Sequence, residues 1–261
     1  MNIFNNEMSL NPNTIGQARS LQEALDLNNA GKIAAIIGVE GGHSIENNLD
    51  NLVNLYNQGM RYLTITWNNS TSWAVAAADP RSDSVGLSDF GRSVIKMMDS
   101  LGIIIDISHT GIQTIEDILD VTKNPIIATH SGVRVIRNRT RNLYDDQIIS
   151  IAKSGGVIGV VFYPPFLKNG SADIEDVIQH IDYIVNLVGI DYVAIGSDFD
   201  GIEVTPVGLE DVTKFPNLTL KLLEHGYTQQ DVEKILGGNF MRVFEQVCGN
   251  TKLTVNKRDS L

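Results

Sequence analysis

The sequence predicts an α/β fold of the (β/α)₈ barrel type, with about six of the eight strands present. Six apolar segments alternate with segments of helical periodicity, an order typical of a parallel sheet. Four of the six end in a histidine or a carboxylate. Because a barrel gathers its functional groups at the carboxyl ends of its strands, this pattern favours a barrel over a doubly wound sheet. We expect strands at residues 33–39, 61–67, 102–108, 125–130, 156–163 and 192–197.

The helices are predicted from apolar residues spaced three and four positions apart. Ser88 is a typical N-cap residue before one of them, and Gly31, Gly59 and Gly102 stand where three of them end. Residues 1–13 match neither a helix nor a strand pattern. We expect one barrel domain over residues 1–248, incomplete at its N-terminus, and a polar tail over 249–261. The expected helices cover 14–30, 44–58, 88–101, 110–123, 145–153, 173–187 and, with breaks, 217–247.

Composition narrows the class of protein. The 261 residues are 43% hydrophobic and 20% charged, which is ordinary for one large globular domain. A net charge of −11 without a Lys/Arg cluster argues against a nucleic-acid partner. The chain shows neither an apolar run long enough to cross a membrane nor a secretory leader, so we expect a cytoplasmic protein. Cys248 is the single cysteine, which excludes an internal disulfide and a thiolate metal cluster.

Four polar residues lie at the ends of four predicted strands: Glu40, His109, His130 and Asp198. Two imidazoles and two carboxylates without thiolates suit Zn²⁺, and also Mn²⁺ or Fe²⁺. A carboxylate that bridges two ions lets them share a hydroxide that is nucleophilic near neutral pH. The set therefore predicts a metal site for hydrolysis.

A structural role is the alternative for each of these residue types. A lone histidine is more often hydrogen-bonded within the fold, and His180 and His225, on predicted helices, are interpreted in that way. His43, which follows Glu40, either orients a metal ligand or bonds the backbone. Trp67 and Trp73 are more often packing residues. Convergence of four polar residues at one sheet edge still favours the metal site.

Several short motifs occur in one order with fitting gaps. They are Gly38–Ser44, Gly59–Thr64, Asp106–His109, Ala128–Ser131, Arg141-Asn142, Ser197–Gly201 and Leu236–Phe240. Together they resemble the membrane (renal) dipeptidase family, the M19 metallopeptidases of the amidohydrolase type, over about residues 20–247.

The resemblance implies a zinc dipeptidase that cleaves dipeptides with a metal-bound hydroxide on a barrel holding two Zn²⁺ ions. It implies that Glu40 bridges both ions and that His109 and His130 bind the second. Asp198 would belong to the first ion and pass a proton to the departing amine, so Glu40 and Asp198 are the expected catalytic residues. The expected substrate-binding residues are Arg141, Tyr163 and Trp67.

Two departures from the family pattern keep alternatives open. No histidine precedes Glu40, so the His-x-Asp pair of the family's first strand is missing, and we expect an N-terminally shortened member. Trp67 stands where the animal enzymes place a histidine. One alternative is therefore an impaired relative that acts as a binding protein or a remnant, and another is an amidohydrolase acting on a different small amide or lactam. A homo-oligomer, in which a second copy covers the missing strands, is a further expectation.

Overall fold

The computed structural model of the protein describes residues 2–249. Its centre is a six-stranded parallel sheet in the order β3-β4-β5-β6-β7-β8, as predicted. The predicted tail falls, from residue 250 on, outside the described residues. The six strands are β3 (Ile37–Glu40), β4 (Met60–Thr64), β5 (Ile104–Asp106), β6 (Ile126–Ser131), β7 (Val157–Val161) and β8 (Val193–Gly196).

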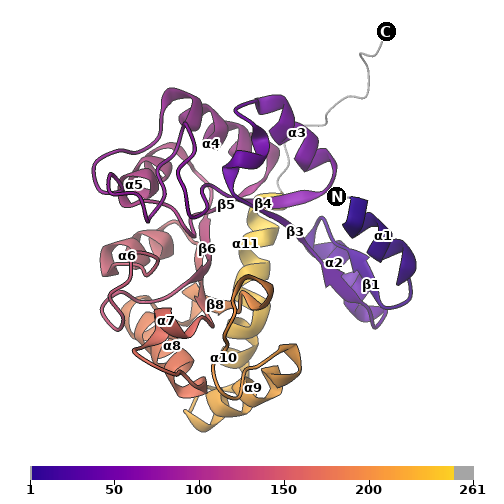
Figure 1. Cartoon of the computed structure of the whole chain (residues 1–261). Helices are drawn as coiled ribbons and strands as arrows, with labels where there is room; N and C mark the ends of the chain where they lie inside the picture. Colours follow the sequence, from indigo (N-terminus) through magenta and orange to yellow (C-terminus); the bar gives the residue numbers. More distant parts are fainter. Residues whose placement is uncertain (1, 250–261) are drawn as a thin grey trace.

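Helices cover both faces of this sheet. Figure 1 shows α4, α5, α6 and α8 in an arc on one side and α11 on the other. The helices between the strands are α3 (Leu49–Asn57), α4 (Asp89–Leu101), α5 (Ile112–Val121), α6 (Asp145–Lys153), α7 (Pro164–Leu167) and α8 (Ile174–Val188). After β8 follow α9 (Phe215–Glu224), α10 (Gln229–Glu233), a π-helical turn (Lys234–Gly238) and α11 (Asn239–Cys248).

The two-sided cover explains why the strands are continuous apolar runs in the sequence. In β5, Ile105 belongs to the large core under the outer helices, whereas its neighbour Ile104 packs with Val243 and Phe244 of α11. Successive side chains of a strand point to opposite faces, so both faces need apolar residues when both are covered.

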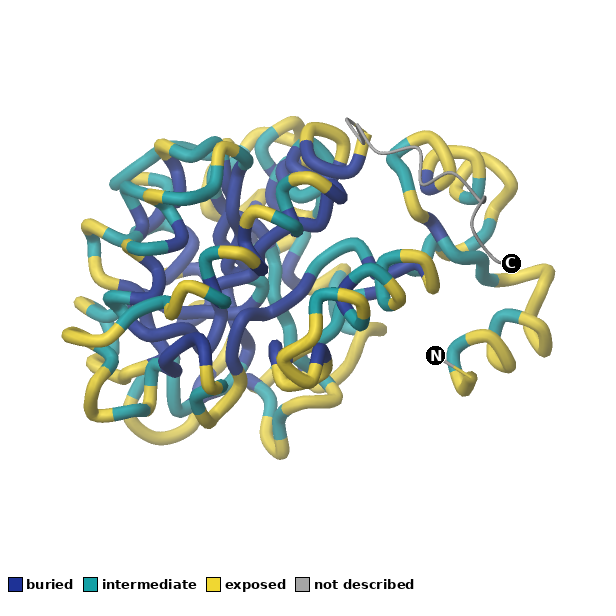
Figure 2. The backbone as a smooth tube through the Cα atoms, turned by 90° about the horizontal axis from the view of Figure 1, so that it is seen from above, coloured by how far each residue is buried: buried dark blue, intermediate teal, exposed yellow. Residues whose placement is uncertain are grey.

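The N-terminal region differs from the prediction. Residues 33–39 are not one strand, because β2 (Ile33–Ala35) pairs with β1 (Ile15–Gln17) in a separate parallel sheet. The helix expected over 14–30 begins later, as α2 (Leu21–Asn29), because the Ser20 side chain accepts a hydrogen bond from Glu23 N and caps it there. Residues 2–10 form a further helix, α1 (Asn2–Leu10), that had no predicted structure. Figures 1 and 2 show this region beside the main body, with mostly exposed and half-buried residues.

The two edge strands of the sheet, β3 and β8, line one cavity of about 430 Å³, which shows that the sheet is curved. Glu40 of β3 and Asp198, just after β8, both border this cavity, together with His130 of β6. Curvature therefore brings the first and last strands of the sheet to a common centre, as barrel closure does. None of the described helices is long and apolar enough to cross a membrane.

Candidate metal centre

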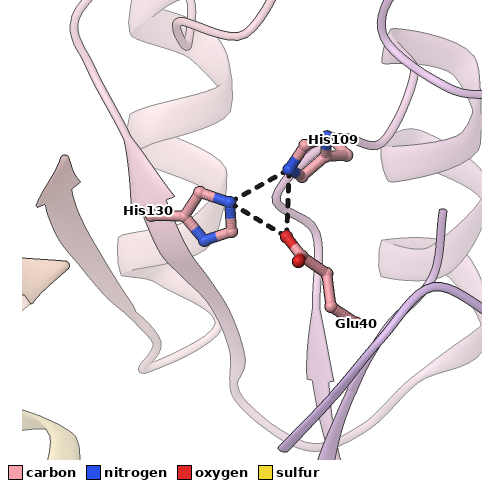
Figure 3. A group of neighbouring side chains, drawn as sticks. All are labelled: Glu40, His109 and His130. Atoms are coloured by element: carbon pink, nitrogen blue, oxygen red, sulfur yellow. Dashed lines mark hydrogen bonds and ion pairs between the residues drawn. The ribbon is translucent and has the colours of Figure 1, made fainter. Parts of the chain in front are cut away.

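Three of the four predicted ligands meet at the carboxyl ends of three strands. Glu40 is the last residue of β3, His109 follows β5, and His130 lies in β6 (Figure 3). Their nearest ligand atoms all lie within 4.8 Å of one another. Parallel neighbours end at the same edge of the sheet, which is why residues so far apart in sequence converge.

The three ligand atoms form a nearly equilateral triangle. Glu40 Oε1 is 3.1 Å from His109 Nε2 and 3.2 Å from His130 Nε2, and the two nitrogens are 3.0 Å apart. With metal–ligand bonds of about 2.1 Å, two ligand atoms on one ion lie about 3.0 Å apart at a right angle and about 3.4 Å apart in a tetrahedron. The spacing and the N₂O donor set thus fit one divalent metal ion.

Hydrogen bonds fix which nitrogen of His130 faces the triangle. The Thr129 hydroxyl lies 2.7 Å from Asp106 Oδ2 and 2.8 Å from His130 Nδ1. Its single proton goes to the carboxylate, so His130 Nδ1 must carry a proton and donate it to the Thr129 oxygen. With Nδ1 protonated, Nε2 is the nitrogen that can give up its proton and offer a lone pair to an ion, as a metal ligand must.

Asp106 organises this arrangement and had no predicted role. Its fully buried carboxylate accepts hydrogen bonds from the Thr64 hydroxyl at 2.5 Å, the Thr129 hydroxyl, and the amides of Ser108 and Thr129 at 3.0 and 2.9 Å. It thereby ties together β4, β5 and β6 behind the ligands. An acid inside the apolar run Ile103–Ile107 was the available sequence signal, since a buried charge in a strand needs dedicated partners.

We expect the Thr129→Val substitution to weaken metal binding about 10- to 100-fold, because it removes the group that orients His130. Thr129→Ser keeps the hydroxyl and should restore affinity. Competition with a chromophoric chelator measures both. Thr122→Val is the matched control, because the Thr122 hydroxyl also donates to an aspartate, Asp99, at 2.7 Å but away from the site. Equal metal affinities of the Thr129→Val and Thr122→Val variants would contradict the proposed tautomer.

The His109 ring is prepared for a ligand in a different way. Its backbone lies in the left-handed region, with φ of 66°, which is uncommon for a residue with a side chain. Burial lowers the pKa of this imidazole, so its neutral, metal-binding form is favoured. When no ion is bound, the two imidazoles, His109 first, can donate from Nε2 to Glu40 and hold the pKa of its carboxyl well below the usual range, and a bound ion would take the place of these protons. Glu40 is therefore ionised at neutral pH.

Asp198 and Arg141 lie around the triangle without joining it. Asp198 borders the 430 Å³ cavity, but no oxygen of it lies within 4.8 Å of all three ligand atoms. Burial raises the pKa of its carboxyl. Arg141 is 9% exposed, and its Nη2 donates to the His130 carbonyl at 3.3 Å. Burial lowers the pKa of this guanidinium to about 10, while Asp106, Glu40 and Asp198 favour its charge.

The remaining predicted residues lie at different distances from the centre. The Trp67 ring is 6.5 Å from the His109 ring and 47% of the residue is exposed, so it does not pack in the core as Trp73 does. Tyr163 precedes α7 and packs edge-on against Phe166 at 4.9 Å. Neither Trp67 nor Tyr163 borders the 430 Å³ cavity.

The other histidines have partners elsewhere. His180 is fully buried, where its Nδ1 accepts from Val133 N and its Nε2 lies 3.1 Å from the Leu167 carbonyl. His225 pairs with Glu175 at 2.7 Å, and His43 Nε2 lies 3.3 Å from the Ser70 carbonyl. The structural interpretation of His180 and His225 agrees with these contacts.

Comparison with known proteins identifies the family to which this chain belongs. The sequence matches the membrane dipeptidases, peptidase family M19, over residues 1–258. The structure is similar to that of the probable dipeptidase PvdM from Pseudomonas aeruginosa, with 26% identity and a TM-score of 0.90 over 95% of this chain and 77% of that one.

Two further solved structures are also similar to this chain. A metallo peptidase from Rhodobacter sphaeroides, solved with a phosphinate mimic of the dipeptide L-Ala-D-Ala, is 28% identical with a TM-score of 0.84, over 89% of this chain and 69% of that one. An amidohydrolase from Pseudomonas aeruginosa is 27% identical with a TM-score of 0.89, over 95% and 83%. The chain therefore belongs to the membrane dipeptidase family, peptidase family M19.

Proposed function

We propose that this protein is a zinc-dependent dipeptidase that hydrolyses the peptide bond of dipeptides. The observation that carries the proposal is the triangle of Glu40, His109 and His130, of which Glu40 and His130 border a cavity of about 430 Å³. This volume is in the range of small-molecule sites. Membership of the dipeptidase family and the dipeptide mimic bound to the similar R. sphaeroides enzyme support a dipeptide as substrate.

Glu40, His109 and His130 would hold the ion. When bound, a divalent ion supplies Lewis acidity, polarising the scissile carbonyl and acidifying a water molecule. Glu40 contacts both imidazoles through Oε1, so its Oε2 is the atom placed to accept a proton from water. Asp198 borders the same cavity as Glu40, and burial raises the pKa of its carboxyl, which suits it to take up a proton and pass it to the departing amine nitrogen.

Arg141 provides the positive charge for substrate binding. Its guanidinium is buried next to the ligand His130, and none of the ion pairs found within residues 2–249 includes it. A buried guanidinium without a carboxylate partner in direct contact is suited to bind the carboxylate of a dipeptide or a developing oxyanion. Trp67, whose ring lies 6.5 Å from that of His109, and Tyr163 would add aromatic surface for the substrate.

We expect Arg141→Met to raise KM for a dipeptide about 10- to 100-fold, since a hydrogen bond to a charged group is worth about 1.5–3 kcal/mol. Steady-state kinetics measures the change, and circular dichroism checks that the variant folds. Arg139→Met is the matched control, because Arg139 lies on the same loop, is exposed, and bonds only the Pro165 carbonyl among the hydrogen bonds found. A similar KM change in both variants would argue against the role of Arg141.

A second candidate is hydrolysis of another small amide or lactam, favoured by the similar P. aeruginosa amidohydrolase and by the exposed Trp67 ring beside His109. A substrate panel separates the candidates. It should contain dipeptides with L- and D-residues at the C-terminus, an N-acetylated dipeptide, and a lactam. Faster turnover of free dipeptides supports the dipeptidase, and faster turnover of the lactam supports the second candidate. No turnover of any of them by zinc-loaded protein would favour the non-catalytic alternative.

A further inference from the structure

The triangle of ligand atoms has the size of a single ion. Each of the three atoms lies 3.0–3.2 Å from the other two, so all three face one central point. In two-metal sites the ions lie about 3.5–4 Å apart. A second ion therefore needs further donors of its own, and the cavity that Glu40 borders is also bordered by Asp198.

Histidines do not supply these donors. The sequence contains five, and all are accounted for by the structure. Two form the triangle. His180 uses both ring nitrogens within the core, His225 pairs with Glu175 on the surface, and His43 lies against the Ser70 carbonyl and the Asn69 amide.

Carboxylates supply only one further donor for a second ion besides Glu40. Among the described residues, Glu40 and Asp198 are the two acids that border the 430 Å³ cavity. Asp106 lies nearby, but its two oxygens already accept four hydrogen bonds. A second ion would therefore rest on Glu40, already shared with the first, and on Asp198, whereas zinc in proteins takes three or four protein ligands.

The charges of the centre also balance with a single ion. Glu40, Asp106 and Asp198 contribute three carboxylates, and Arg141, beside the ligand His130, contributes one buried cation. When ionised, these groups leave two negative charges, which one divalent ion neutralises. A second ion would add two positive charges to a group of residues that already includes a guanidinium that is 9% exposed, and uncompensated buried charge is costly.

We infer that this chain binds one divalent ion, on Glu40, His109 and His130, where the family resemblance implies two. The Asp198 carboxylate then faces the substrate and not a metal. The inference rests on the proposed metal-dependent function and concerns the number of ions that this sequence can hold.

The test is the metal stoichiometry of the purified full chain. Native mass spectrometry after Zn²⁺ loading and removal of loosely bound ions counts the ions, and electron paramagnetic resonance of the Mn²⁺-loaded protein reports whether two ions are coupled. We expect one ion per chain and an uncoupled Mn²⁺ signal. Asp198→Asn should retain one ion with affinity within about threefold of the original chain, and His130→Ala should lose it.

Each outcome has a separate meaning. Two ions per chain with a coupled Mn²⁺ signal, one of them lost in Asp198→Asn, would overturn the inference and leave the proposed metal-dependent function standing. Loss of the only ion in Asp198→Asn would also overturn it. Binding of no ion by folded protein would contradict the proposed function itself. One ion bound by a chain without dipeptide hydrolysis would leave the stoichiometry correct and the substrate wrong.

Discussion

Glu40→Gln is expected to lower kcat/KM for a dipeptide by at least about 10³-fold, equivalent to about 4 kcal/mol of transition-state stabilisation. Glutamine has nearly the same shape, but it cannot place a negative charge between His109 Nε2 and His130 Nε2, which Glu40 Oε1 contacts at 3.1 and 3.2 Å. The variant also loses the oxygen placed to accept a proton from water. Kinetics at saturating Zn²⁺, together with a chelator titration, measures both losses.

The fold should tolerate this substitution, because the Glu40 side chain is 43% exposed and its partners are His109 and His130. Glu46→Gln is the matched control, since Glu46 is an exposed glutamate in the loop that follows the same strand. Activity in Glu40→Gln within tenfold of that of Glu46→Gln would contradict the role assigned to Glu40.

Asp106→Asn is expected to have the largest effect on stability, about 2–4 kcal/mol, and to weaken metal binding at least tenfold. The substitution puts an NH₂ donor where an acceptor is needed. The Thr64 and Thr129 hydroxyls and two backbone amides all donate to this fully buried carboxylate, so at least one donor loses its acceptor. Loss of the Thr129 contact also frees the His130 ring.

Urea unfolding with and without Zn²⁺ measures both effects. Asp99→Asn is the matched control, since Asp99 also accepts several hydrogen bonds, from the Thr122 hydroxyl, Lys123 N and the Asn124 amide, but is only half-buried. We expect it to cost less than about 1 kcal/mol and to leave metal affinity unchanged. Equal destabilisation by the two substitutions would contradict the proposal that Asp106 organises the site.

The main sheet could be predicted from the sequence because its strands are buried on both faces. Runs such as Ile103–Ile107 and Pro125–Ala128 have few other structural uses, and a polar residue at the end of each marked the functional edge. The small β1–β2 sheet could not be predicted. Its strands have three residues each, and β2 continues after one residue into β3, so an apolar run alone gives no sign that it divides between two sheets.

The types of residue at the site could be predicted from the sequence, but the distances between them could not. Glu40, His109 and His130 meet because neighbouring strands end together, but the same reasoning assigned equal weight to Asp198, which lies outside the triangle. Its backbone is in the left-handed region, with φ of 59°, and such a turn after β8 sets the side-chain direction in a way that spacing cannot reveal. Asp106 was overlooked because its partners lie on other strands.

The most direct test of the central claim is dipeptide hydrolysis that depends on the bound ion. The purified chain is stripped with a chelator, assayed with a dipeptide, and assayed again as Zn²⁺ is added in steps. We expect no turnover by the stripped protein and activity that rises with Zn²⁺ to a plateau at one ion per chain. Hydrolysis that persists in the stripped protein, or a folded zinc-loaded protein that cleaves no dipeptide, would contradict it.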